Sequence, residues 1–150
     1  MNRDIIPDVS LSTDIIVGFP GETDDDFQDT MNIVKYVEFD SVYMFQFSPR
    51  PGTKAYDMED EFVNQDIIKK RFQHLKDVQT DISEKRLKRY VGTKQLLLIE
   101  KPSKKNNRVL TGKIDSGQIT HIDKKNVSIG DIVQVKITDS TPFYLKAELI

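Results

Sequence analysis

The sequence contains no cysteine among its 150 residues. Without thiols the chain forms no disulfide bond and offers no thiolate ligand to a metal ion. Iron–sulfur clusters of the usual kind, which cysteine thiolates hold, are excluded for the same reason. The two histidines, His74 and His121, lie far apart in different sequence contexts, and no carboxylate pair has ligand spacing. We therefore expect structural roles for both histidines and predict no metal site and no catalytic residue.

Long apolar runs are also missing. No stretch approaches the roughly 18 apolar residues that a membrane span needs. Residues 1–10 carry aspartates and a proline where a signal peptide has its apolar region. Hydrophobic residues make up 37% of the chain and charged residues 31%, which is typical of a soluble protein with modest cores. The composition predicts a cytoplasmic protein that does not bind membranes.

The net charge of −2 hides an uneven distribution along the chain. Residues 1–92 hold 12 Lys and Arg against 18 Asp and Glu, a net charge of −6. Residues 93–150 hold 10 against 6, a net charge of +4. This asymmetry predicts two parts with different partners, and a small basic domain is a candidate for binding a polyanion.

Residues 13–22, TDIIVGFPGE, predict a buried strand over 13–19 that breaks into a glycine turn. Thr23 is a good N-cap for a helix over residues 24–37, whose first turn holds three aspartates. The turn is not a phosphate loop of the Walker type, because no Lys-Ser/Thr pair follows Gly21. Two interpretations remain, a turn that approaches a ligand and an ordinary turn between strand and helix.

A second strand is predicted over residues 42–47, which makes a parallel strand–helix–strand unit. Residues 48–53 contain two prolines and a glycine, so we expect a rigid loop. Arg50 lies in this loop beyond the carboxyl end of the strand, where parallel sheets place ligand sites. It is either a contact to an anionic or adenosyl group or a surface arginine paired with a carboxylate. Residues 57–61 predict a solvated acidic linker.

The rest of the chain predicts one long helix and a small β-barrel. The helix runs from Asn64 to about Tyr90, and its cationic end either caps the helix or meets RNA phosphates. From residue 93 onward the apolar period changes to two, and turn signals separate five short strands, as in a closed barrel of the OB type. The helix carries one apolar stripe, formed by Ile68, Phe72, Leu75, Val78 and Ile82. The predicted barrel strands are residues 94–101, 108–114, 118–123, 131–138 and 143–149.

The barrel has basic loops, which is where OB folds meet oligonucleotides. Its only aromatic residues are Phe143 and Tyr144, so we expect contacts to the phosphates and shape of a folded RNA more than base stacking. The alternative is a solvated lysine face without a ligand. The candidate RNA-binding residues are Lys101, Lys104, Lys105, Arg108, Lys124 and Lys125.

Two phrases, TDIIVGFPGETDDDF (residues 13–27) and FDSVYMFQFSPRPGTKAY (residues 39–56), are similar to the C-terminal part of the radical S-adenosylmethionine methylthiotransferases. The phrase FSPRPGT resembles the branch of the tRNA 2-methylthio-N6-dimethylallyladenosine synthases most closely. The resemblance implies an α/β remnant, a connecting helix and an all-β, OB-like TRAM domain. Residues 1–62 would hold the last two βα units of a radical S-adenosylmethionine partial barrel, residues 63–92 the helix and residues 93–150 the TRAM domain.

The resemblance also implies cofactors. The full-length family uses S-adenosylmethionine and two 4Fe-4S clusters, and the clusters require cysteines that this chain lacks. We therefore expect this chain alone to bind none of them and to be inactive. The resemblance places the polar residues Asp14, Gln46 and Ser48 toward the barrel lumen. The implied wall of the S-adenosylmethionine cavity consists of Gly18, Phe19, Pro20, Gly21, Glu22, Gln46, Ser48 and Arg50.

The expected function is therefore that of a C-terminal fragment. The family methylthiolates N6-isopentenyladenosine near the anticodon of tRNA, and this chain would supply the domain that binds the anticodon arm. Its partners would be tRNA and a missing N-terminal portion of the same enzyme. The bare edge of the parallel strands predicts self-association as well. The alternative function is a free-standing, non-catalytic RNA-binding protein.

Overall fold

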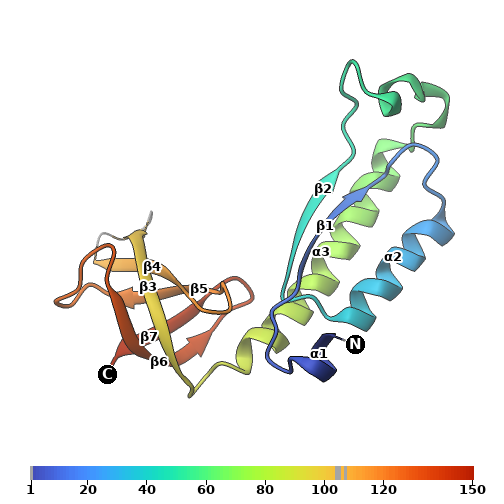
Figure 1. Ribbon diagram of the computed structural model, residues 1–150. Helices are drawn as coiled ribbons and strands as arrows, with labels where there is room; N and C mark the ends of the chain where they lie inside the picture. Colours follow the sequence, from blue (N-terminus) through green and yellow to red (C-terminus); the bar gives the residue numbers. More distant parts are fainter. Residues whose placement is uncertain (1, 104–105, 107) are drawn as a thin grey trace. The chain divides into compact units, whose positions relative to one another are not determined.

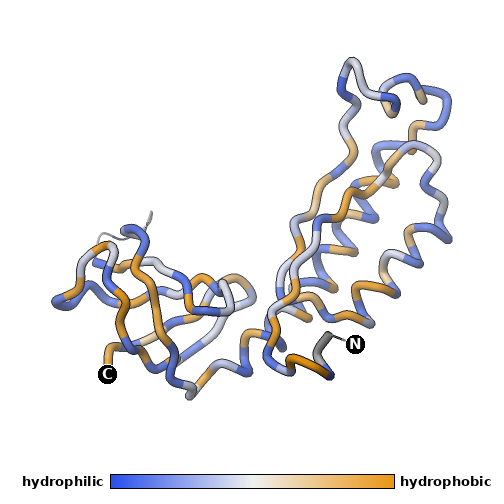
Figure 2. The backbone as a smooth tube through the Cα atoms, viewed as in Figure 1, coloured by the Kyte–Doolittle hydropathy of each residue, from blue (hydrophilic) through white to orange (hydrophobic). Residues whose placement is uncertain are grey.

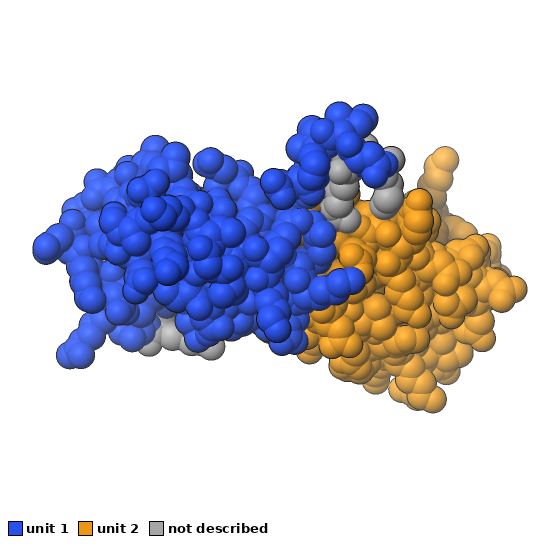
Figure 3. Space-filling model, turned by 90° about the horizontal axis from the view of Figure 1, so that it is seen from below, with its two compact units in different colours: residues 1–10, 83–150 blue, residues 11–82 orange. Residues whose placement is uncertain are grey.

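A computed structural model describes residues 2–103, 106 and 108–150 of the chain. The chain forms two compact units, residues 11–82 and residues 1–10 together with 83–150, which are coloured separately in Figure 3. Their boundary falls inside the long helix α3 (Gln65–Lys88) rather than at either of its ends. Among the helices described, none is long and apolar enough to cross a membrane.

The unit of residues 11–82 is built on a parallel pair of strands. Strands β1 (Ser12–Val17) and β2 (Ser41–Gln46) pair in parallel, with Thr13 opposite Val42 and Val17 opposite Gln46. Helix α2 (Asp24–Val37) connects them (Figure 1). The predicted strand–helix–strand unit is therefore confirmed.

Local sequence explains the bounds of α2. Thr23 and Asp26 form a capping box, in which the Asp26 N–H donates to Thr23 Oγ1 at 3.2 Å and the Thr23 N–H donates to Asp26 Oδ2 at 2.9 Å. The Thr23 hydroxyl also donates to Asp26 Oδ2 at 2.6 Å, and this hydrogen bond, followed by the one from the Thr23 N–H, lowers the pKa of Asp26. The helix ends at Glu38, which adopts a left-handed conformation with φ 49° and donates its N–H to Val34 O.

The core of this unit lies on one face of the two strands. Val17 of β1 packs with one face of α2 and with Leu75 of α3, and Figure 2 shows the alternation of hydrophobic and hydrophilic residues along both helices. The predicted stripe of α3 is confirmed at Ile68 and Leu75, which are buried. Sequence periodicity did not reveal that Arg71 and Gln79 are buried between these apolar positions.

The segment between β2 and α3 is more ordered than predicted. It holds the short 3-10 helices η1 (Lys54–Asp57) and η2 (Glu59–Glu61), and the carbonyl of Glu61 accepts a 2.9 Å hydrogen bond from the Gly21 N–H. The acidic side chains of Asp57, Glu59, Asp60 and Glu61 are exposed, as predicted for a solvated linker, but the two 3-10 helices and the backbone contact to Gly21 were not predicted. An acidic composition signals exposure of side chains, but it carries no information on what the backbone binds.

The second unit is a closed barrel in the order β3-β4-β5-β7-β6, as predicted. All its pairs are antiparallel except the parallel pair of β5 and β7. Residues 1–10 belong to this unit, and Ser10 Oγ accepts a 2.9 Å hydrogen bond from Gln118 Nε2. Helix α1 (Asn2–Ile5) lies in this segment. The strands are β3 (Lys94–Pro102), β4 (Val109–Ile114), β5 (Ile119–Asp123), β6 (Ile132–Ser140) and β7 (Leu145–Leu149).

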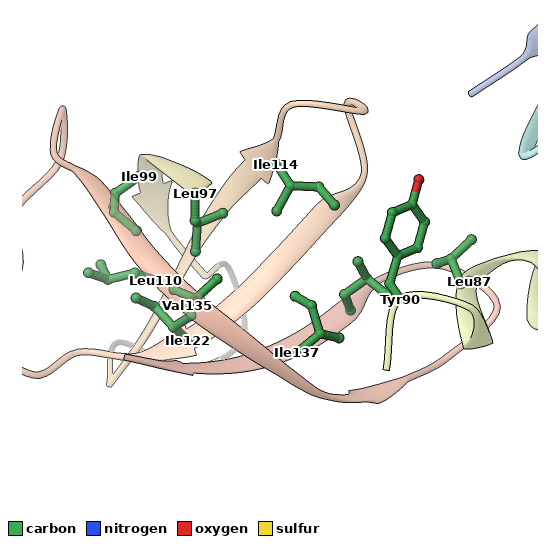
Figure 4. Packing of buried hydrophobic residues seen from close by; sticks show 10 residues of the cluster. Leu87, Tyr90, Leu97, Ile99, Leu110, Ile114, Ile122, Val135 and Ile137 are labelled. Carbon is green, nitrogen blue, oxygen red and sulfur yellow. The ribbon is translucent and has the colours of Figure 1, made fainter. Parts of the chain in front are cut away.

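Inward-facing aliphatic residues fill the barrel (Figure 4). Tyr90, just beyond α3, packs against this core and donates its hydroxyl hydrogen to Ser116 Oγ at 2.9 Å. Gly112 occupies a buried position of β4, where an added Cβ would lie 2.0 Å from the carbonyl oxygen of Leu98. Only glycine allows β3 and β4 to approach this closely, next to a bulge between Ile99 and Lys101.

Candidate functional site

The glycine turn after β1 is held by hydrogen bonds from its own amides. Gly18 and Gly21 have φ values of 77° and 78°, in the left-handed region that favours glycine. The Gly18 N–H donates to Glu22 Oε2 at 3.0 Å, and the Gly21 N–H donates to Glu61 O. Both amides are therefore used within the chain, and the turn meets any ligand through other groups. Phe19 is exposed at this turn, whereas Pro20 is buried.

Arg71 of α3 holds the glycine turn in place through hydrogen bonds to Glu22 and Asp24. Its guanidinium donates to Glu22 Oε1 at 2.5 Å and to Asp24 Oδ1 at 2.6 Å, and it lies 5.5 Å from the centre of the Phe27 ring. Desolvation opposes the charge of Arg71, but the bonds to Asp24 and Glu22 outweigh it and raise its pKa. Both Glu22 carboxylate oxygens are thus bound by the chain itself, so Glu22 positions the turn.

The loops after β1 and β2 meet, as the parallel pairing requires. The Phe47 N–H donates to Val17 O at 2.8 Å, and the Phe47 ring contacts Phe19 and Phe62 edge to face, with centroids 5.5 and 5.7 Å apart. Ser48 and Arg50 follow this contact and are exposed. The role of these residues in a cofactor cavity stays a prediction.

Asp14 and Gln46, which the resemblance places toward a barrel lumen, are both exposed, and the strand register puts them on different faces of the strand pair. Asp14 is exposed on the sheet face that carries the exposed side chains of Ile16, Tyr43 and Phe45. Gln46 pairs with Val17, so strand alternation assigns it to the opposite face, although Gln46 at the end of β2 is itself exposed. Asp14 and Gln46 therefore do not share a face, because they lie on paired strands at positions of opposite parity.

Three segments bring the predicted basic residues to one end of the barrel. Lys101 lies near the end of β3, and Arg108 precedes β4. Lys124 follows β5, and its N–H donates to the Arg108 carbonyl at 2.7 Å. The exposed residues Lys101, Arg108, Lys124 and Lys125 form what we call the basic end. Lys104 and Lys105, which were predicted to join it, lie outside the described residues.

A groove of about 790 Å³ adjoins the basic end. Lys101 lines it together with residues that the sequence did not single out for binding, among them His121 and Lys146. Phe143 and Tyr144 also line it, although the sequence favoured phosphate contacts over stacking. The signal for this groove in the sequence is weak, since its residues come from strands far apart in the chain.

His121 is part of the barrel structure on this side, in line with the structural role expected for it. Its Nδ1 lies 2.9 Å from Thr111 Oγ1, and its ring contacts Tyr144 edge to face, with centroids 4.5 Å apart. Burial lowers the pKa of His121, while a hydrogen bond with the backbone of Leu110 acts in the opposite direction. The folded barrel thus favours the neutral imidazole.

Mild acid is expected to destabilise the barrel through His121. The unfolded chain takes up this proton near the usual pKa of about 6.5. The folded chain takes it up only at lower pH, so the free energy of unfolding falls as the pH drops through this range. Thermal unfolding measured from about pH 7.5 down to 5.5 should show a larger fall in Tm for the wild type than for His121→Gln. Equal losses would contradict the assignment, because Asp26 and Asp139, with pKa values lowered from 3.8, titrate at more acidic pH.

Within the described residues, no group of three or more His, Asp and Glu side chains is placed to hold a metal ion. Residues 88–150, which contain the five strands of the closed barrel, match the TRAM domain family.

Over nearly its whole length, the chain is similar to the C-terminal part of tRNA-2-methylthio-N(6)-dimethylallyladenosine synthases, which confirms the predicted resemblance. It is 41% identical to the synthase of Corynebacterium jeikeium over 149 residues, which cover 97% of this chain and 29% of that protein. It is 43% identical to the synthase of Clostridium botulinum strain Hall, covering 99% of this chain and 33% of that protein. For Geobacillus kaustophilus the identity is 42%, covering 97% and 27%. The chain thus spans about a third of the length of these curated relatives.

Proposed function

We propose that this chain binds the anticodon arm of tRNA through the basic end of its TRAM barrel. It would do so as part of an enzyme that methylthiolates N6-isopentenyladenosine near the anticodon. The observation that carries the proposal is the convergence of Lys101, Arg108 and Lys124 at one end of a positively charged domain. Clustered cations of this kind release counterions from nucleic-acid phosphates and give salt-dependent binding.

The proposed contribution to chemistry is limited to a cavity wall. The loops after β1 and β2 meet at the carboxyl ends of parallel strands, a common place for ligand sites, and this supports a contact to S-adenosylmethionine. The 4Fe-4S clusters of the family do not fit this chain, because it supplies no thiolate ligand. The reaction therefore requires a cysteine-bearing protein portion as a partner.

The bare outer edges of the parallel strands are the proposed contact for that partner. In the part of the chain that the structure describes, β1 pairs only with β2, so each strand keeps one unpaired edge. An unpaired edge binds another strand readily, from the cysteine-bearing portion or from a second copy of this chain.

The absence of cysteine favours a second candidate, a free-standing RNA-binding protein without catalytic activity. Immunoblotting of the endogenous protein separates the two. A band much larger than this chain supports the methylthiotransferase, and a band of this length supports the free-standing protein.

RNA binding is expected to be strongly salt-dependent. With about four phosphate contacts, affinity for an anticodon stem-loop should fall about a hundredfold between 50 and 200 mM salt. Replacing Lys124 and Lys125 by glutamine should weaken binding and flatten the salt slope, because each lost contact removes about 0.7–0.9 from the slope. The measurement is fluorescence anisotropy across a salt series.

The matched control replaces Lys94 and Lys136, which are exposed and paired at the start of β3, away from the basic end. This double variant should keep the wild-type salt slope. Tight binding that salt does not change would contradict the proposal, and so would equal losses in the two double variants.

A further inference from the structure

The groove beside the basic end combines aromatic rings with cations. Phe143 and Tyr144 provide the rings, and Lys101 and Lys146 lie among the lining residues. All of these residues belong to the barrel unit. Flat rings next to cations are the two elements with which proteins bind unpaired bases and the phosphates that join them.

Phe143 is displayed on a fixed turn between β6 and β7. Thr141 Oγ1 accepts hydrogen bonds from the N–H groups of Phe143 at 3.3 Å and Tyr144 at 3.1 Å, and it donates to Tyr144 O at 3.0 Å. The Thr141 N–H donates to the same Tyr144 carbonyl at 2.9 Å. The Phe143 side chain nevertheless remains 69% exposed. A rigid turn that holds an aromatic ring in water is organised in advance for stacking, which reduces the entropy lost on binding.

The Tyr144 ring is held in place by a neighbouring side chain. His121 contacts Tyr144 edge to face and is itself held by Thr111, so the wall of the groove beside Phe143 does not need to rearrange. Lys146 forms a 2.7 Å ion pair with Asp139, which raises the pKa of Lys146 and holds its side chain in place.

The charges lining the groove are mixed, and this fits a nucleotide better than a purely anionic ligand. Asp123 and Glu148 line the groove together with the two lysines. Carboxylates accept hydrogen bonds from the amino groups of bases, while Lys101 continues into the basic end, where phosphates would lie. A bare polyanion has no groups to pair with these acids.

We propose that this groove binds an unpaired RNA base, which stacks on Phe143 while the flanking phosphates lie along the basic end. The inference rests on the proposed RNA-binding function and deepens it. It adds that the barrel selects looped or single-stranded RNA over duplex, a selection that phosphate contacts alone do not provide.

The test compares two RNA probes that carry the same number of phosphates, with the full chain as the protein. One is a stem-loop with 2-aminopurine placed at each loop position in turn, and the other is a blunt duplex. Phe143→Ala should weaken stem-loop binding about tenfold and leave duplex binding unchanged, because base–aromatic stacking is lost. At one loop position the wild type should change the 2-aminopurine fluorescence, and Phe143→Ala should abolish that change. Phe143→Tyr should retain both.

Ile132→Ala is the matched control, because Ile132 is 68% exposed on β6 and does not line the groove. Salt-dependent binding of both probes with no effect of Phe143→Ala would overturn this inference and leave the proposed function standing. Failure of the wild type to bind either probe would overturn both. Sedimentation of the same variants tests whether a second copy of this chain occupies the groove instead. A dimer that only Phe143→Ala dissociates would make the groove a contact between copies and overturn the inference.

Discussion

Gly112→Ala is expected to lower the free energy of unfolding of the barrel unit by about 3 kcal/mol. The added methyl group would lie 2.0 Å from Leu98 O and 2.8 Å from Leu98 C, which are backbone atoms of the neighbouring strand. A flexible side chain can move aside, but a paired strand cannot do so without losing hydrogen bonds. Because small domains are stable by only about 5–15 kcal/mol, the variant should lose a large part of its stability. Denaturant unfolding followed on barrel resonances by NMR measures this loss.

Gly117→Ala is the control for this experiment. Gly117 lies in the same unit with a φ of 80°, and an added Cβ there would have no atom within 4 Å. Its expected cost is only the left-handed strain of about 1–2 kcal/mol. If both variants lose the same stability, close approach of β3 and β4 is not what requires Gly112.

Arg71→Met is expected to destabilise the unit of residues 11–82 by about 3 kcal/mol, because it leaves a nearly buried carboxylate without its cation. The side chains of Arg71 and Glu22 are only 8% and 12% exposed. The Glu22 carboxylate also accepts the Gly18 N–H, so the glycine turn should loosen. Hydrogen exchange of the Gly18 amide should therefore become faster in Arg71→Met. The increase should exceed what the loss of global stability, measured by denaturant unfolding of the unit, accounts for.

Lys69→Met serves as the matched variant on the same helix. Lys69 lies 3.5 Å from Asp66 in an ion pair whose side chains are 66% and 81% exposed, so its loss should cost less than about 1 kcal/mol. Adding Glu22→Gln to Arg71→Met should restore part of the lost stability, since it removes the unpaired charge. If the double variant regains no stability, or if Arg71→Met and Lys69→Met lose the same stability, Arg71 acts through packing alone.

The secondary structure could be predicted from the sequence because its signals are local. Apolar periodicity, the Thr23 cap and the glycine turns each act within a few residues, and the strands and helices follow them closely. The burial of Arg71 could not be predicted in this way. Its partner Glu22 lies 49 residues earlier, so only the tertiary fold brings the two together.

The candidate sites show the same difference between features with local sequence signals and features that only the tertiary fold brings together. Composition alone indicated the basic residues, and the antiparallel pairing of β4 with β5 brings Arg108 next to Lys124. The groove escaped prediction because Lys101, His121 and Phe143 come from segments that the order β3-β4-β5-β7-β6 brings together. The sequence did not reveal that Asp14 and Gln46 lie on opposite faces of the strand pair, because the faces that two paired strands share depend on their register.

The position of β7 in the barrel has a consequence for the nascent chain. β7 pairs with β5 on one side and β6 on the other, so it alone closes the barrel. While the ribosome has made β3 to β6 but not β7, these strands form at most an open sheet with β5 and β6 as bare edges. Such edges invite pairing with other chains, and a domain made at a few residues per second stays in this state until its last strand emerges. The interval between the emergence of β6 and that of β7 from the ribosome therefore sets how long this domain is open to misassembly.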